Sequence, residues 1–85
     1  MHNESIPAAD LCRAMHEQIE AALPGAEVEV TGGGGHFEIR VVSSAFEGLN
    51  TLKKQRLVYS AIKDLMAGDS APVHAIDRMI TEVPS

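Results

Sequence analysis

The chain has 85 residues and a hydrophobic fraction of 45%, which fits one small folded domain spanning residues 1–85 and excludes a disordered chain. Its formal net charge of −5 argues against a phosphate backbone as the default partner, unless basic residues gather locally. No apolar run approaches the roughly 20 residues of a membrane span, and the first residues lack the pattern of a secretory signal, so we expect a cytoplasmic protein with no membrane partner.

The first predicted element is an amphipathic helix over residues 5–23. Ser5 can cap this helix, and Pro7 fits its first turn. Apolar residues recur at steps of three or four and predict one buried stripe: Leu11, Met15, Ile19 and either Ala22 or Leu23. The pair Pro24-Gly25 ends the helix.

Two strands are predicted next, over residues 26–31 and 37–42. In both strands charged residues alternate with apolar ones, which is typical of a sheet with one wet face and one buried face. The strands should form an antiparallel hairpin. We expect the glycine run between them, residues 32–35, to be a flexible connector.

The remaining chain predicts an irregular segment over residues 43–51, anchored by Phe46, and a second helix over residues 52–67 that ends at Gly68. Its expected buried stripe is Leu57, Val58, Ala61, Ile62 and Leu65. A third strand lies within residues 73–83. The element order is therefore α-β-β-α-β, an α+β fold.

Two histidines are the strongest candidates for a functional site. His36 directly precedes the second strand, and His74 begins the third. If these strands pair in parallel, their first residues meet at one edge of the sheet, about 4.8 Å apart, within reach of a shared metal. Two imidazoles fill only half of a tetrahedral metal site, so the other ligands would come from another molecule. The alternative is that each is an ordinary exposed histidine.

The other candidate functional residues are supported by weaker sequence patterns. Cys12 is the only cysteine, which excludes an internal disulfide and a thiolate centre built from this chain alone. Cys12 and His16 could chelate a metal across one helical turn, but a packed cysteine beside a solvated histidine is the favoured interpretation. His2 is assigned no role. The glycine run is followed by a strand and no Lys-Ser/Thr pair, so it is not interpreted as a phosphate-binding loop.

The densest basic cluster is Lys53, Lys54 and Arg56, with Lys63 two turns further on. Around a helix, Lys53, Arg56 and Lys63 fall within about 80° of one another. We interpret the cluster as a docking patch for an acidic partner or phosphate, with a solvated helix face as the alternative. No aromatic residue is expected among these charges, so base stacking is not predicted. No nucleophile–base pair is visible, so no enzyme activity is predicted.

Several stretches between residues 26 and 76, in this order and spacing, resemble the BolA family. They are Val28-Glu29-Val30-Thr31-Gly32, Gly35-His36-Phe37-Glu38, Val41-Val42-Ser43-Ser44-Ala45-Phe46-Glu47-Gly48, Lys54-Gln55-Arg56-Leu57-Val58-Tyr59 and His74-Ala75-Ile76. The second and fourth are most similar to its bacterial IbaG (YrbA) branch. The resemblance implies a fold like the class II KH domain, with a three-stranded mixed sheet covered by helices.

The resemblance also implies a function. BolA-like proteins pair with monothiol glutaredoxins around a [2Fe–2S] cluster, so this chain is expected to be an adaptor that traffics or senses such a cluster. The glutaredoxin and bound glutathione would each give a thiolate. His74 and His36 match the positions of the family's own ligands, and the isolated chain would hold no cluster. A role in stress response and a weak homodimer are further expectations.

The alternative function is a KH-like nucleic-acid-binding transcriptional regulator that uses the helix starting near Leu52, since other BolA-like proteins are regarded as DNA-binding regulators. Two departures weaken this alternative. The KH loop needs Gly-x-x-Gly, and this chain has Gly48-Leu49-Asn50-Thr51 instead. The chain also stops at Thr81-Glu82-Val83-Pro84-Ser85, without the Trp-containing stretch that often ends the family.

Overall fold

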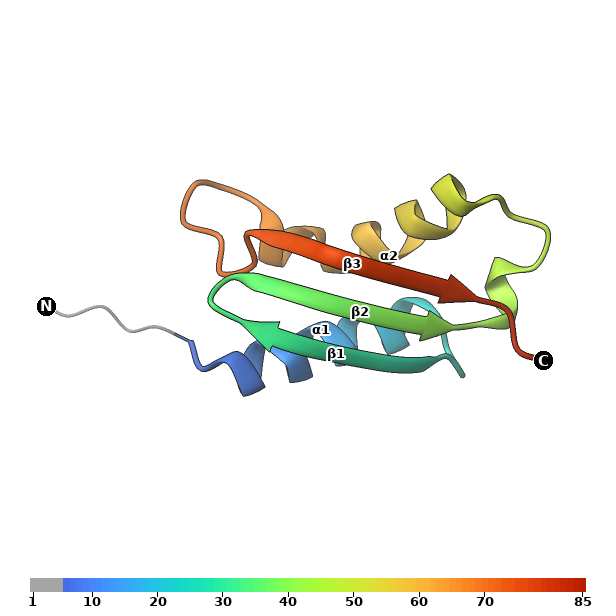
Figure 1. The fold of residues 1–85 in the computed structure, drawn as a ribbon, viewed down its shortest axis with the longest axis horizontal. Coiled ribbons are helices and arrows are strands. Elements are labelled where there is room, and N and C mark those ends of the chain that lie inside the picture. Colours follow the sequence, from blue (N-terminus) through green and yellow to red (C-terminus); the bar gives the residue numbers. More distant parts are fainter. Residues whose placement is uncertain (1–5) are drawn as a thin grey trace, which may run out of the picture.

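The computed structural model describes residues 6–85, in which two helices pack behind a three-stranded sheet (Figure 1). The elements, in chain order, are α1 (Ala8–Ala22), β1 (Glu27–Gly33), β2 (His36–Val42), the 3-10 turn η1 (Ser44–Phe46), α2 (Thr51–Met66) and β3 (Ala75–Glu82). This order confirms the predicted α-β-β-α-β arrangement and the α+β class.

The sheet has the strand order β1-β2-β3, with β2 in the centre. Strand β1 runs antiparallel to β2, and Val28 lies opposite Val41. Strand β3 runs parallel to β2, and Ala75 lies opposite His36. The mixed sheet is therefore confirmed, and the first residues of β2 and β3 share one edge.

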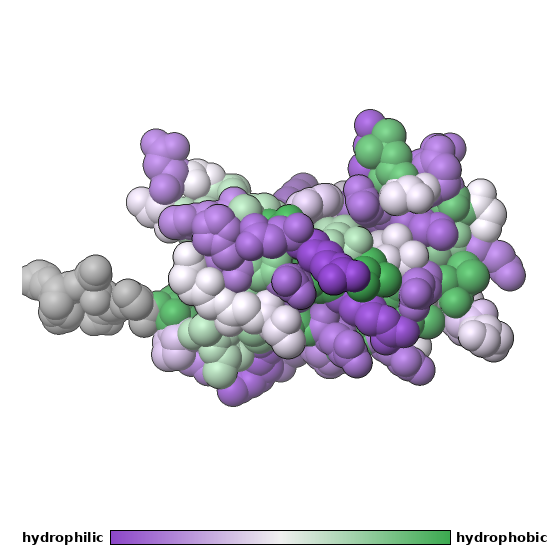
Figure 2. Space-filling model, viewed as in Figure 1, coloured by the Kyte–Doolittle hydropathy of each residue, from purple (hydrophilic) through white to green (hydrophobic). Residues whose placement is uncertain are grey.

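The core lies between one face of the sheet and the two helices. Phe37, Ile39 and Val41 of β2 are buried there, as alternation along a strand requires. The α1 stripe is confirmed, with Leu23 rather than Ala22 as its last buried member. Val58 and Ile62 anchor α2, and Phe46 is fully buried as predicted. The helices cover this face only, and Figure 2 shows hydrophilic side chains running across the uncovered face.

The second helix departs from prediction at Leu57, which is 37% exposed and does not belong to the buried stripe. Leu57 precedes Ile62 by five positions, which places it about 140° away around the helix, so it points out of the core. The helix begins at Thr51 because the Asn50 side chain accepts a hydrogen bond from the Lys53 N–H at 2.9 Å.

The first helix has no side-chain cap. Pro7 occupies the N-cap position, just before the first turn rather than within it, and its carbonyl accepts the N–H groups of Asp10 and Leu11. The predicted cap, Ser5, lies outside the described residues. Neither helix within residues 6–85 is long and apolar enough to cross a bilayer.

The glycine run is not the flexible connector that we predicted. Gly32 and Gly33 belong to β1, and only Gly34 and Gly35 form the turn, with φ of 64° and 86°. A two-residue turn with positive φ at both positions is the tight hairpin that matches the twist of the flanking strands. Gly32 has φ of 133°, and a Cβ there would lie 2.4 Å from the His36 carbonyl oxygen. Three of the four glycines, Gly32, Gly34 and Gly35, therefore have positive φ values that the hairpin geometry requires.

Candidate functional site

The tip of the β1–β2 hairpin is joined to the start of β3 through the backbone of Gly35. Its carbonyl oxygen accepts two hydrogen bonds, from the His74 N–H at 2.8 Å and the Ala75 N–H at 3.0 Å. A Cβ on Gly35 would lie 2.9 Å from Nδ1 of His74 and 3.0 Å from its Cγ. The imidazole of His74 therefore lies against the turn in space that only glycine leaves free.

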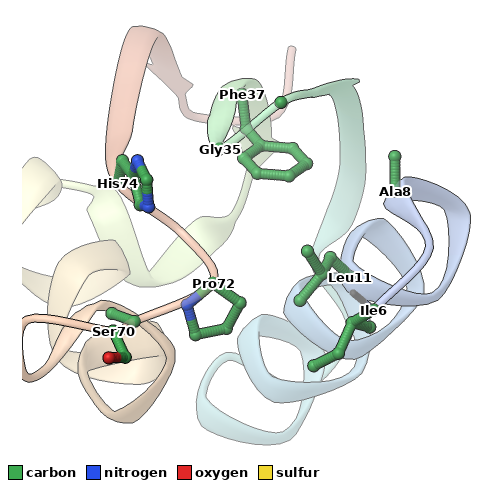
Figure 3. Close-up of a pocket in the computed structure, with 10 residues that line it drawn as sticks. Ile6, Ala8, Leu11, Gly35, Phe37, Ser70, Pro72 and His74 are labelled. Atoms are coloured by element: carbon green, nitrogen blue, oxygen red, sulfur yellow. The ribbon is translucent and has the colours of Figure 1, made fainter. Parts of the chain in front are cut away.

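His74 is exposed and lies on the rim of a cavity of about 450 Å³. The cavity opens between the hairpin tip, the segment before β3 and the start of α1, and its wall is largely apolar (Figure 3). Phe37, Leu11 and Pro72 project toward it from these three directions. His74 is thus an exposed residue at the side of the cavity, and its backbone is held by the Gly35 carbonyl.

His36 is the first residue of β2, and its side chain is 57% exposed. Its Nδ1 lies 3.0 Å from Oδ1 of Asp77 in β3. Side chains alternate along a strand, and the next residue, Phe37, faces the helices, so His36 emerges on the uncovered face of the sheet. Its ring is held at Nδ1, and no described residue hydrogen-bonds to Nε2.

The structure brings the backbones of the two histidines to one edge, as predicted from strand order. The two imidazoles have different surroundings: His74 lines the cavity, as Phe37 does, whereas His36 lies against Asp77. Within residues 6–85, no three His, Cys, Asp or Glu side chains gather closely enough to hold a metal ion. Two imidazoles could supply at most half of a tetrahedral metal site. Metal binding by His36 and His74 stays a prediction.

The pair Cys12 and His16 follows the packed interpretation. Cys12 packs against the core, and burial raises the pKa of its thiol above the ordinary value. His16 lies near Glu20 instead, with Nδ1 at 3.5 Å from Oε1. Packing of Cys12 and the contact of His16 with Glu20 both favour the packed interpretation over a chelate. His2 lies outside the described residues.

The basic cluster on α2 divides into two parts. Lys53, Arg56 and Lys63 are exposed, whereas Lys54 is half-buried. Lys54 is two positions from Arg56, about 160° away around the helix, so it does not share the face that Arg56 presents.

A stripe of mixed character runs along the exposed side of α2. Tyr59 is 38% exposed and lies three positions after Arg56 and four before Lys63, so it shares their face. Leu52, 55% exposed, continues the same face by one turn. We call Leu52, Arg56, Tyr59 and Lys63 the α2 stripe. The prediction that no aromatic residue interleaves with the charges is wrong, because helical spacing places Tyr59 between two of them.

Two residues of interest were missed from the sequence. Tyr59 could have been found by counting steps of three and four from the basic residues. Asp77 could not be found this way, because it is 41 positions from His36 in the sequence and the local strand register is irregular.

Comparison with known proteins gives a consistent result. A family model described as BolA-like protein matches residues 13–82. The chain is 36% identical over 55 residues to the acid stress protein IbaG of Escherichia coli (65% of this chain and 63% of IbaG). It is 45% identical over 56 residues to BolA-like protein 1 of Bos taurus, covering 66% of this chain but 34% of the bovine protein. Among solved structures, BolA1 of Arabidopsis thaliana superimposes with a TM-score of 0.72 at 26% identity, covering 86% of this chain and 90% of that chain.

Proposed function

This chain belongs to the BolA-like family, and from that premise we propose that it is a non-enzymatic adaptor that shares a [2Fe–2S] cluster with a monothiol glutaredoxin and glutathione. His74 and His36 would be its ligands. The partner's cysteine and glutathione would supply the two thiolates. When bound, the cluster could transfer electrons or be passed on to another protein. Imidazole ligands in place of thiolates raise its reduction potential.

The observation that supports the proposal most strongly is the way the backbone and ring of His74 are positioned. Its backbone N–H is bonded to the Gly35 carbonyl at 2.8 Å, and its ring lies against a turn that leaves no room for a side chain at Gly35. His74 as a whole is nevertheless exposed. A histidine that serves packing would bury its ring, whereas a ligand needs a fixed backbone and an open nitrogen. The fixed backbone and the exposure of His74 together support a role as a ligand to a cluster that a second protein also binds.

Docking of the partner would use the α2 stripe. Its two cations, Arg56 and Lys63, form no ion pair with a described residue, although the chain as a whole carries a charge of −5. Cations that have no ion-pair partner within residues 6–85, next to an exposed tyrosine, favour a partner surface that carries carboxylates and an apolar contact.

Reconstitution tests the proposal. The purified chain is mixed with a monothiol glutaredoxin, glutathione, iron and sulfide, and visible absorption and circular dichroism are recorded. We expect a spectrum of the mixed complex that differs from that of the glutaredoxin cluster alone. His74→Ala should abolish that difference, while His16→Ala, a histidine on α1 away from the edge, should preserve it. An unchanged spectrum with His74→Ala would show that His74 is not a ligand.

A second candidate, nucleic-acid binding, is favoured by one observation: Tyr59 stands between two cations on the α2 stripe. Aromatic and cationic side chains together bind single-stranded nucleic acid through stacking and phosphate contacts. This function predicts a steep salt dependence of affinity and a loss of binding in Tyr59→Ala. A DNA affinity that is absent at low salt would exclude it.

A further inference from the structure

An irregularity in the parallel pairing of β2 and β3 lies directly beside His36. Phe37 is opposite Ile76, but the next residue, Glu38, is opposite Arg78, so Asp77 has no partner in β2. Asp77 is thus the extra residue of a β-bulge. Bulges re-aim a side chain at the point where the ladder is interrupted. At this bulge the Asp77 carboxylate lies against the imidazole that opens the neighbouring strand.

The contact between the two residues fixes which nitrogen of His36 carries the proton. Nδ1 and Oδ1 are 3.0 Å apart, a hydrogen-bonding distance. An ionised carboxylate can only accept, so Nδ1 must carry the hydrogen and donate it. In the neutral ring the lone pair then stays on Nε2. A histidine that binds a metal through one nitrogen commonly donates its other N–H to a carboxylate in this way.

We propose that Asp77 is a positioning residue that holds Nδ1–H of His36 and thereby makes Nε2 the nitrogen that His36 offers to the shared cluster. The role of Nε2 as a cluster ligand rests on the proposed function, whereas the hydrogen bond from Nδ1–H of His36 to Asp77 does not. Both side chains are more than half exposed, His36 by 57% and Asp77 by 54%. The bond therefore biases the ring without burying it, and a partner can still reach Nε2.

The first test uses the isolated chain labelled with ¹⁵N-histidine at about pH 8, where imidazole is ordinarily neutral. Nitrogen–proton correlations across the ring distinguish the nitrogen that carries hydrogen from the one that carries the lone pair. We expect Nδ1–H and a free Nε2 for His36, and a loss of this preference in Asp77→Ala and Asp77→Asn. Glu38→Gln removes the same charge from the same sheet face and should keep the wild-type pattern. A wild-type His36 with hydrogen on Nε2, or a pattern unchanged by Asp77→Ala, would overturn the proposal.

The second test uses the cluster-bound complex with glutaredoxin and follows the loss of the cluster to a chelator. Removal of such a carboxylate typically weakens metal binding 10- to 100-fold, and for this exposed pair we expect about tenfold faster loss in Asp77→Ala. Glu38→Gln should change the rate less than twofold. A rate unchanged by Asp77→Ala would reject Asp77 as a positioning residue for the ligand. If the wild-type chain took up no cluster at all, the proposed function and the role of Nε2 as a cluster ligand would fail together, while the tautomer result would still decide the hydrogen bond from Nδ1–H to Asp77.

Discussion

The hairpin edge and the α2 stripe are both exposed, but different forces hold their side chains in place. At the hairpin edge the backbone does the positioning: two consecutive glycines with positive φ make the turn, and one carbonyl accepts two N–H groups from the start of β3. On α2 the backbone is an ordinary helix, and only residue spacing brings Tyr59 between Arg56 and Lys63. The edge should therefore be sensitive to backbone changes, and the stripe should respond mainly to changes of charge or contact.

The largest expected effect is at Gly32, behind the hairpin tip. Gly32→Ala would place a Cβ 2.4 Å from the His36 carbonyl oxygen at a φ of 133°, which side chains rarely tolerate. We expect a loss of about 4 kcal/mol in the free energy of unfolding, enough to prevent folding of a domain this small. Urea denaturation measures it.

The matched control is Gly34→Ala, where a Cβ would meet no atom within 4 Å and only the positive φ of 64° opposes it. Its cost should be about 1 kcal/mol. Equal stabilities of the two variants would mean that the hairpin is not crowded as described.

Within α2 the contrast is between a core side chain and its exposed neighbour. Ile62 is fully buried and Leu57 is 37% exposed. Ile62→Ala should lower the free energy of unfolding by about 3 kcal/mol, because it leaves a cavity in the core. Leu57→Ala should cost less than about 0.5 kcal/mol, as for most surface changes. Urea denaturation of both variants measures these losses. A loss of unfolding free energy well above about 0.5 kcal/mol for Leu57→Ala would show that Leu57 contributes to the core.

The stripe itself is tested by charge reversal. Arg56→Glu should weaken binding to the glutaredoxin about fivefold at low salt, and the difference should shrink as salt is added. Arg13→Glu on α1 makes the same change of net charge at another exposed arginine and should leave the affinity within about twofold. Calorimetric titrations at two salt concentrations measure these affinities. Equal losses in both variants would point to net charge rather than to the stripe.

The smallest expected effect concerns Cys12. Burial raises the pKa of its thiol, so the folded chain holds this proton at a pH where the unfolded chain has released it. Stability from this group is complete below the unfolded thiol pKa of about 8.5 and falls as pH rises toward the higher folded value. Alkylation by iodoacetamide should thus show a midpoint at higher pH in the folded chain than in urea. Coinciding midpoints would contradict the raised pKa.

Much of the fold follows from sequence pattern. Steps of three and four located the stripe of Leu11, Met15 and Ile19, and alternation located the buried side of β2. The helix between β2 and β3 allowed a parallel pairing, which the resemblance to the BolA family also implied and the structure confirms. The errors come from geometry that patterns do not carry. A run of glycines suggests mobility. Here, however, Gly32 lies too close to His36, and Gly35 too close to His74, for either glycine to carry a side chain.

The candidate site was predictable only in part. Strand order brought His36 and His74 to one edge, and that part is confirmed. Alternation relative to Phe37 already implied that His36 turns to the uncovered face. The ring of His74 could not be placed in this way, because His74 precedes the first residue of β3. Ligand binding itself involves atoms from a second molecule, and no property of one chain determines it.

The central claim is that imidazoles of this chain bind the shared cluster. Pulsed electron paramagnetic resonance tests it on the complex in which only this chain carries ¹⁵N-histidine and the cluster is reduced. We predict a strong coupling to imidazole nitrogen that is lost in His74→Ala and retained in His16→Ala. A reduced cluster in the mixed complex without such a coupling would contradict the account.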